Sequence, residues 1–182
     1  MEYFVQLQFE FNMANNKKFY VFSYGSNLLF RRIYERVSTV KIMNKCLLKG
    51  YKLAFNKLSK DGSTKANIVA TGKASDGVWG MAHSIDYEQK SMLDFYEGLG
   101  YGYDLHEITS HLDINVRPVF AYIATDPKYL FDGKPFTWYH KLVHLGAQEN
   151  DFPAYYINFI KSIKSEQDSD AERVAKIAHL LS

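Results

Sequence analysis

Short apolar runs separated by polar turns occupy the first two thirds of the chain, and such runs are typical of β-strands. The segments that follow this pattern are residues 19–23, 44–55, 66–71, 78–85, 101–109 and 117–125. The second is long enough for two strands. The turn Ser75-Asp76-Gly77 separates residues 66–71 from 78–85, so we expect these two segments to pair with each other.

Helical spacing appears at two places among these strands. The apolar residues Phe30, Ile33, Tyr34 and Val37 predict an amphipathic helix that begins just after the strand at 19–23. Its natural N-cap is Asn27, because the side-chain oxygen of asparagine can accept a hydrogen bond from a free N–H group of the first turn. The junction between strand and helix is therefore the tight turn Tyr24-Gly25-Ser26-Asn27.

A second helix is predicted between Gln89 and Tyr96, where apolar positions again recur at helical spacing. Asp86 and Gln89 have the spacing of a capping box, which would start this helix. Gly98 is expected to end it in the left-handed conformation. Glu97 then lies at the last position of the helix, immediately before this glycine.

The last third of the chain has helical spacing. Pro135 opens a segment that ends near Gly146, and Pro153 opens the next. A final helix collects apolar residues on one face: Ala171, Val174, Ala175, Ala178 and Leu181. Strands followed by helices indicate an α+β fold, here a small mixed β-barrel or strongly curved sheet flanked by helices. Residues 19–182 are expected to form one domain, preceded by an N-terminal arm or extra edge strand at 1–18.

Composition narrows the functional classes. The 182 residues include 22 basic and 20 acidic side chains, so the net charge of +2 offers no electrostatic argument for binding nucleic acid or a membrane. The single Cys46 excludes an internal disulfide framework and favours a reducing compartment. No apolar run has the length of a membrane span, and residues 1–18 lack the features of a signal peptide. We therefore expect a cytoplasmic protein.

The turn at residues 24–27 is the first candidate site. A helix N-terminus presents free N–H groups and the positive end of the helix dipole, which together attract an anionic oxygen. Gly25 allows a tight turn and close approach of a ligand. The pattern differs from a Walker loop, which has a second glycine followed by lysine. By spacing alone it is also typical of an ordinary strand-to-helix turn.

Glu97 is the second candidate. The negative end of the helix dipole disfavours a charged carboxylate there, which favours a role in taking and returning a proton. Gly98, Gly100 and Gly102 follow in alternation and leave room for a ligand, but their spacing differs from that of a dinucleotide fingerprint. A solvated surface glutamate before a helix cap is the alternative. Neither site requires a metal or another cofactor.

Four motifs, in order along the chain, together resemble the γ-glutamylcyclotransferase family. They are residues 22–29 (FSYGSNLL), 78–80 (VWG), 93–98 (LDFYEG) and 146–150 (GAQEN), the last followed by Pro153 and Tyr156. The resemblance covers residues 19–164. The last motif is similar to that of the animal-type branch. Asn27 departs from the leucine of the glutathione-specific branch, and Ser26 from the threonine of the γ-glutamylamine branch.

The resemblance implies a lyase of glutathione metabolism that converts γ-glutamyl amino acids to 5-oxoproline and a free amino acid. It implies Glu97 as the catalytic acid and base, and a family tyrosine at Tyr122 that lines the pocket. The implied substrate-binding residues are Tyr24, Gly25, Ser26, Asn27, Leu28, Leu29 and Tyr122. The partner is then a small γ-glutamyl substrate, and the family suggests a homodimer.

Two alternatives stay open at this point. One is a binding protein that holds a γ-glutamyl or similar small anionic ligand without turning it over. The other is a related enzyme that removes a γ-glutamyl group from a larger biosynthetic intermediate. Glu97 separates the first alternative from an enzyme, because simple binding does not require a proton acceptor at that position.

Overall fold

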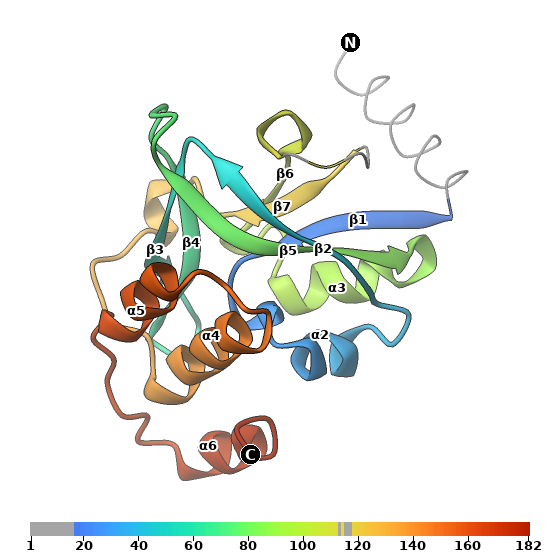
Figure 1. Cartoon of the computed structure of the whole chain (residues 1–182). Coiled ribbons are helices and arrows are strands. Elements are labelled where there is room, and N and C mark those ends of the chain that lie inside the picture. The colour runs from blue at the N-terminus through green and yellow to red at the C-terminus, as the bar shows by residue number, and fades with distance from the viewer. Residues whose placement is uncertain (1–16, 113, 115–117) are drawn as a thin grey trace.

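A five-stranded mixed sheet forms the centre of the computed structural model, which describes residues 17–112, 114 and 118–182 (Figure 1). The strand order is β2-β5-β1-β7-β6. All neighbours are antiparallel except β1 and β7, which are parallel. The strands are β1 (Lys18–Ser23), β2 (Lys41–Lys49), β5 (Gly77–Asp86), β6 (Asp104–Glu107) and β7 (Phe120–Ile123).

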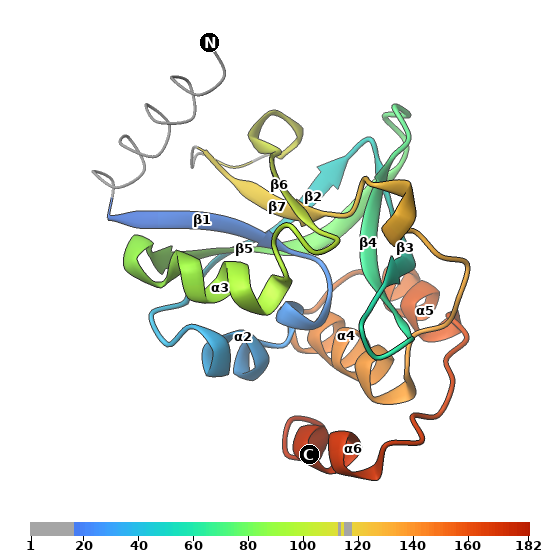
Figure 2. The same cartoon turned by 180° about the vertical axis from the view of Figure 1, so that it is seen from behind.

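A two-stranded sheet, β3 (Tyr51–Leu58) and β4 (Thr64–Ala70), lies beside the larger one. The helices are α2 (Phe30–Arg36), α3 (Lys90–Glu97), α4 (Thr137–Glu149), α5 (Ala154–Ser162) and α6 (Ala171–Ala178). Short 3-10 turns are η1 (Ser26–Leu28), η2 (Tyr87–Gln89), η3 (Thr109–His111) and η4 (Pro127–Tyr129). Both views place α2 and α3 along β1, and α4 and α5 beside β3 and β4 (Figures 1 and 2).

Strand β1 separates two apolar cores. Phe19 and Val21 point into a core shared with α2 and α3, whereas Phe22 points into a larger core shared with α4 and α5. Successive side chains of a strand point to opposite faces, so both faces of β1 are covered. The end of β1 therefore lies where the two cores meet, and this is where the turn at residues 24–27 begins.

This architecture confirms the predicted α+β class with a curved sheet and helical flanks. Within the described residues the strands form open sheets and not a closed barrel. The last third is helical, as expected. Residues 1–16 of the expected N-terminal arm or edge strand lie outside the described residues, and β1 already begins at Lys18.

The expected pairing of residues 66–71 with 78–85 is wrong. β4 pairs with β3, while β5 lies between β1 and β2. β5 is buried along most of its length, so its backbone groups need partners on both edges, and β1 and β2 supply them. The turn at 75–77 thus joins two sheets instead of two neighbouring strands.

The predicted capping box is also wrong. Asp86 forms an ion pair with Lys18, and the side chain of Gln89 accepts hydrogen bonds from the backbone and hydroxyl of Thr39. Helix α3 begins at Lys90, after the short turn η2. Its predicted end is confirmed, because Gly98 has φ +69° in the left-handed region.

The predicted buried face of the last helix is wrong as well. Val174 is exposed, and the apolar residues that α6 and the following turn bury are Ile177 and Leu180. Arg31 donates to the carbonyl of Leu180 at 2.9 Å, which fixes this end of the chain against α2. The segment is therefore docked through its C-terminal end and not along the expected face.

Candidate active site

The turn at residues 24–27, called here the cradle loop, leaves β1 and enters η1. The N–H groups of Leu28 and Leu29 are used inside the turn, donating to Gly25 O at 3.0 Å and Ser26 O at 3.2 Å. The Ser26 N–H faces the Tyr139 hydroxyl, so the N–H groups of Gly25 and Asn27 are the loop's candidate donors to a ligand. A side chain at Gly25 would come within 3.1 Å of both Ala66 and the Tyr139 hydroxyl, so glycine lets the loop pass between them.

Helix α4 and the residue that follows it hold the cradle loop in place. Asn150 donates to Leu28 O at 2.8 Å and to Gly146 O at 2.7 Å. A Cβ at Gly146 would lie 2.6 Å from the Leu29 nitrogen and 2.7 Å from the Leu28 carbonyl carbon. Glycine at 146 therefore lets the helix contact the backbone just after the loop, and Asn150 ties the two segments together.

Asn27 does not cap helix α2, contrary to the sequence-based expectation. The helix begins at Phe30 after Leu29, with no side-chain cap. The Asn27 amide nitrogen instead donates to Glu97 Oε1 at 2.6 Å. The side chain that was expected to start a helix thus joins the cradle loop to the end of α3.

Arg36 completes a three-residue cluster around this carboxylate. Its Nη1 donates to Glu97 Oε1 and to Asn27 Oδ1, each at 2.9 Å. Glu97 Oε2 has no hydrogen-bond partner in the described part of the chain. The cation offsets the negative end of the α3 dipole, and both donors hold one oxygen while leaving the other for a ligand.

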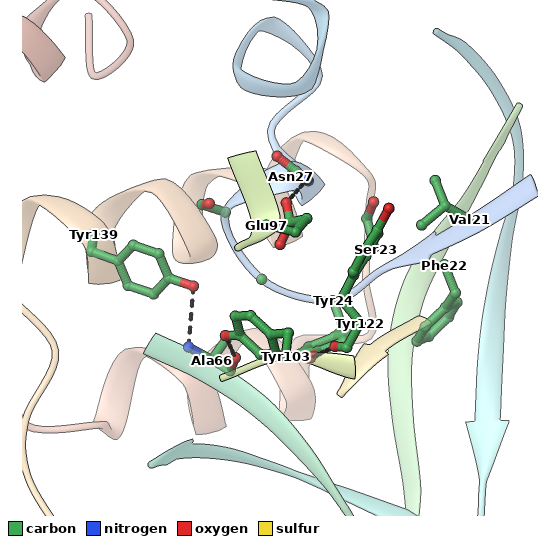
Figure 3. Close-up of a pocket in the computed structure, with 12 residues that line it drawn as sticks. Val21, Phe22, Ser23, Tyr24, Asn27, Ala66, Glu97, Tyr103, Tyr122 and Tyr139 are labelled. Carbon is green, nitrogen blue, oxygen red and sulfur yellow. Dashed lines mark hydrogen bonds between the residues drawn. The ribbon is translucent and has the colours of Figure 1, made fainter. Parts of the chain in front are cut away.

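Glu97 and the cradle loop line one cavity, called here the inner pocket, of about 40 Å³. Figure 3 shows Asn27 and Glu97 on one side of it, with Tyr103 and Tyr122 on the other. The lining residues are Val21, Phe22, Ser23, Tyr24, Gly25, Ser26, Asn27, Ala66, Glu97, Tyr103, Tyr122 and Tyr139. Glu97 is the one carboxylate among them.

Four tyrosines give the inner pocket its neutral polar surface. The hydroxyls of Tyr24 and Tyr103 donate to the carbonyls of Tyr122 and Ala66. Burial raises the pKa of Tyr24, Tyr103 and Tyr122 and raises that of Tyr139 to about 12. These phenols therefore stay protonated at neutral pH, and Glu97 is the group of this pocket suited to accept a proton.

Ser23 and His83 form a second polar pair at the wall of the pocket. Ser23 Oγ lies 3.1 Å from His83 Nδ1. Burial lowers the pKa of His83 to about 4, so the imidazole is neutral at pH 7. Ser23 comes directly before the cradle loop, on a strand and not in a nucleophile elbow. We interpret the pair as a neutral hydrogen bond that positions the end of β1.

The described residues contain neither a cluster of metal-ligating side chains nor a membrane-spanning helix. No group of three or more metal-ligating side chains occurs among residues 17–112, 114 and 118–182. In the same part of the chain, no helix is long and apolar enough to cross a bilayer. The polar side chains of the inner pocket are hydroxyls, an amide and one carboxylate, a set suited to a polar organic ligand.

Sequence comparisons show close relatives of this chain. It is 30% identical to human γ-glutamylcyclotransferase over 158 residues, which are 82% of this chain and 81% of the human protein. It is 31% identical to the bovine γ-glutamylcyclotransferase over the same length and coverage. The chain belongs to the γ-glutamylcyclotransferase family. No family model matches it.

Solved structures agree with this membership. A γ-glutamyl cyclotransferase structure superposes with a TM-score of 0.74 at 25% identity, covering 89% of this chain and 99% of the other. An uncharacterized human protein superposes with a TM-score of 0.72 at 26% identity, covering 88% and 99%. YkqA from Bacillus subtilis shares the fold, with a TM-score of 0.65 at 17% identity, covering 82% of this chain and 56% of YkqA.

The structure brings most of the predicted site residues of this family member together. The predicted residues that line the inner pocket are Tyr24, Gly25, Ser26, Asn27, Glu97 and Tyr122. Leu28 and Leu29 do not line it. They are buried in the core next to α4, because they follow the loop instead of forming it. Tyr122 reaches the pocket from β7 and donates to Asp94 Oδ1 at 2.6 Å.

Sequence reasoning missed Arg36, Tyr103 and Tyr139. Arg36 lies in the last turn of α2, nine residues after Asn27, and nothing in the local pattern separates it from a surface arginine. Tyr103 ends the glycine-rich run that follows Glu97, so proximity in sequence was a usable signal. Tyr139 comes from α4, far along the chain, and only the tertiary fold places it beside Gly25.

Proposed function

We propose that this γ-glutamylcyclotransferase converts a γ-glutamyl amino acid to 5-oxoproline and a free amino acid. Family membership supports the reaction class. One observation carries the assignment of the site: Glu97 is the single carboxylate lining a pocket of neutral groups, and it is held by its Oε1 while Oε2 is free. The identity of the substrate and the residue roles below are part of the proposal.

The reaction begins with proton transfer. The substrate's α-ammonium gives a proton to Glu97 Oε2, and the resulting amine nitrogen attacks the γ-carbonyl carbon of the same molecule. Nucleophile and electrophile belong to one chain, so a pocket that folds the glutamyl group into a ring-like shape supplies much of the rate.

The tetrahedral oxyanion then needs donors. The N–H groups of Gly25 and Asn27 are the candidates, because the loop lines the same cavity as Glu97. Glu97 returns its proton to the leaving nitrogen, the γ-carbon–nitrogen bond breaks, and 5-oxoproline and the free amino acid result. The ring nitrogen loses its remaining extra proton to solvent, so charge and atoms balance.

Arg36 and Asn27 act through Glu97. Both donate to Oε1, which fixes the carboxylate rotamer and directs Oε2 to the ligand side. Charge-assisted hydrogen bonds of this kind hold geometry better than neutral ones. We assign these two side chains as positioning residues, and the tyrosines as the walls that keep the site polar but uncharged.

The direct test is 5-oxoproline release from γ-glutamyl-alanine, measured by chromatography with the wild-type protein. Turnover that disappears in Glu97→Gln supports the proposal. The matched control is Glu88→Gln, an exposed glutamate just before the same helix, which should keep wild-type activity. Tight binding of the dipeptide without product would favour the binding-protein alternative. Turnover of only a larger γ-glutamyl intermediate would favour the deprotecting enzyme.

The cellular setting is proposed on the same basis. The single cysteine is buried and free, which suits a reducing cytoplasm. A place in glutathione metabolism and a homodimeric state follow from the family resemblance. Size-exclusion chromatography with light scattering measures the oligomeric state directly.

A further inference from the structure

A second cavity of about 140 Å³ continues outward from the inner pocket. Ser26, Glu97, Tyr103 and Tyr139 line both, so the two meet at the proposed catalytic carboxylate. We call the second one the outer cavity. Its remaining lining residues are Arg32, Arg36, Lys57, Ser59, Lys65, Tyr96 and Trp138.

The outer cavity is rich in cations, and two of them are already paired. Arg36 binds Glu97 at 2.9 Å, and Lys65 binds Asp61 at 2.7 Å. Glu97 is the one carboxylate that lines the cavity itself. These two pairs therefore use up the acidic side chains available there.

Lys57 and Arg32 are left without an ion pair in the described part of the chain. Lys57 is only 8% exposed, and its Nζ lies 4.9 Å from the centre of the Tyr103 ring. The Nε of Arg32 is buried with no hydrogen-bond partner. Burial lowers the pKa of Lys57, and burial together with Arg36 lowers that of Arg32 to about 10. With its pKa at about 10, the Arg32 guanidinium is charged at pH 7.

Lys57 is a buried cation without an ion pair, and Arg32 is half-buried with an unpartnered Nε. Such an arrangement is costly, so its presence needs a reason. Gly102 shows that the position of Lys57 is built into the fold. A Cβ at residue 102 would lie 2.5 Å from Lys57 Cε and 3.1 Å from Nζ, and Gly102 itself has φ +118°. The absence of a side chain at Gly102 thus provides the space in which this lysine is held.

The positions of the two cavities relative to Glu97 indicate which part of the substrate would contact the cations. If the inner pocket holds the glutamyl group, the bond to be broken lies at Glu97 and the acceptor amino acid extends into the outer cavity. Every amino-acid acceptor carries one α-carboxylate. An acidic acceptor carries a second carboxylate on its side chain. The number of unpaired cations matches the second case.

We propose that the outer cavity is an acceptor subsite that prefers γ-glutamyl peptides of an acidic amino acid, with Lys57 and Arg32 binding its two carboxylates. This inference rests on the function proposed above. It assigns the choice of substrate to two residues outside the family motifs, since neither Lys57 nor Arg32 lies in any of the four.

The test compares γ-glutamyl-glutamate with γ-glutamyl-glutamine, which have nearly the same shape and differ by one charge. We expect kcat/KM to be at least about tenfold higher for the acidic peptide, the size of one hydrogen bond to a charged group. Lys57→Met and Arg32→Met should each reduce this ratio, mainly through KM. Lys57→Arg should keep it, because the charge remains.

Lys52→Met is the matched control, since Lys52 lies on the same strand but is exposed and outside the cavity. It should leave the ratio unchanged. A wild-type ratio of one or less, or a ratio that Lys57→Met and Arg32→Met leave intact, overturns the acceptor preference while 5-oxoproline release still supports the proposed function. Absence of 5-oxoproline from both peptides overturns the function instead. Calorimetric binding of the same two peptides then decides the subsite: tighter binding of γ-glutamyl-glutamate, weakened in Lys57→Met, retains it, and equal binding rejects it.

Discussion

The inner pocket and the outer cavity share Glu97 but are built from different kinds of residue. The inner pocket has backbone N–H groups, tyrosine hydroxyls and the Asn27 amide. The outer cavity has four cationic side chains. In the inner pocket, hydroxyls of the tyrosines are engaged with the protein's own carbonyl, carboxylate or N–H groups. In the outer cavity, Lys57 and Arg32 lack such partners among the described residues.

This difference separates two tasks. Polar groups that are satisfied by the protein shape a pocket and keep it rigid. Charges that are not satisfied are available to a ligand. The proposed chemistry needs only a compact glutamyl group, a proton acceptor and an oxyanion site, all on the inner side. Acceptor choice belongs to the outer side, where substitutions can change it without altering the reaction.

Substitution of Arg36 tests whether catalysis in the inner pocket and acceptor choice in the outer cavity are independent, because Arg36 lines the outer cavity yet binds Glu97. Arg36→Met should lower kcat for every γ-glutamyl substrate by about 10- to 100-fold, as expected for lost hydrogen bonds to a charged group. Arg36→Lys should recover part of the loss. The measurement is steady-state kinetics with γ-glutamyl-alanine and γ-glutamyl-glutamate. A change in acceptor preference without a loss of kcat would show that Arg36 selects the acceptor and does not position Glu97.

Substitution of Gly146 tests whether the contact between α4 and the cradle loop stabilises the inner pocket. In Gly146→Ala the new Cβ would press on the backbone of Leu28 and Leu29, and overpacking of this kind costs about 1–3 kcal/mol of unfolding free energy. Urea unfolding gives that value, and turnover should fall equally for neutral and acidic substrates. Gln148→Ala, an exposed change on the same helix, is the control. Wild-type stability in Gly146→Ala would contradict the close contact between α4 and the cradle loop.

Substitution of Gly102 tests the role of Lys57 in the outer cavity, and its expected effect on substrate preference is the smallest of the three. Gly102→Ala should displace Lys57 and reduce the preference for γ-glutamyl-glutamate over γ-glutamyl-glutamine by about fivefold, or roughly 1 kcal/mol. Gly100→Ala is a matched control, because Gly100 has φ +78° but no atom within 4 Å of the added Cβ. It reproduces the backbone strain without moving the lysine. Equal effects of both variants on the preference would show strain and not displacement.

The sequence predicted the local elements of the inner side well, for physical reasons. The strand at 19–23, its turn and the helix that ends at Gly98 are set by short-range pattern and by glycine's conformational freedom. The four motifs then implied that Glu97 and the cradle loop are both site residues, and the structure brings them to one pocket. The contact between them still depended on Asn27, whose side chain turned from the predicted helix cap to the carboxylate.

Tertiary relations were beyond the pattern. Which strands become neighbours depends on burial of both strand edges, so β5 paired with β1 and β2 and not with β4. Tyr139 and Arg36 reach the site from separate helices, and periodicity does not distinguish them from other helical residues. Lys57 begins the polar stretch at residues 57–65, where no local pattern indicates burial. Its burial follows from Gly102 and from the pairing of β3 with β4.

The measurement that tests the central claim most directly separates binding from turnover at Glu97. Glu97→Gln keeps the shape of the side chain and a possible contact with Arg36 but removes the proton acceptor. Calorimetry with γ-glutamyl-alanine should give a Kd within about fivefold of the wild-type Kd, measured under conditions in which the wild-type protein turns over slowly. The rate of 5-oxoproline release should fall by about 10²- to 10⁴-fold. Turnover that persists at the wild-type rate in a folded Glu97→Gln protein would contradict the assignment of Glu97 as the acid and base of the reaction.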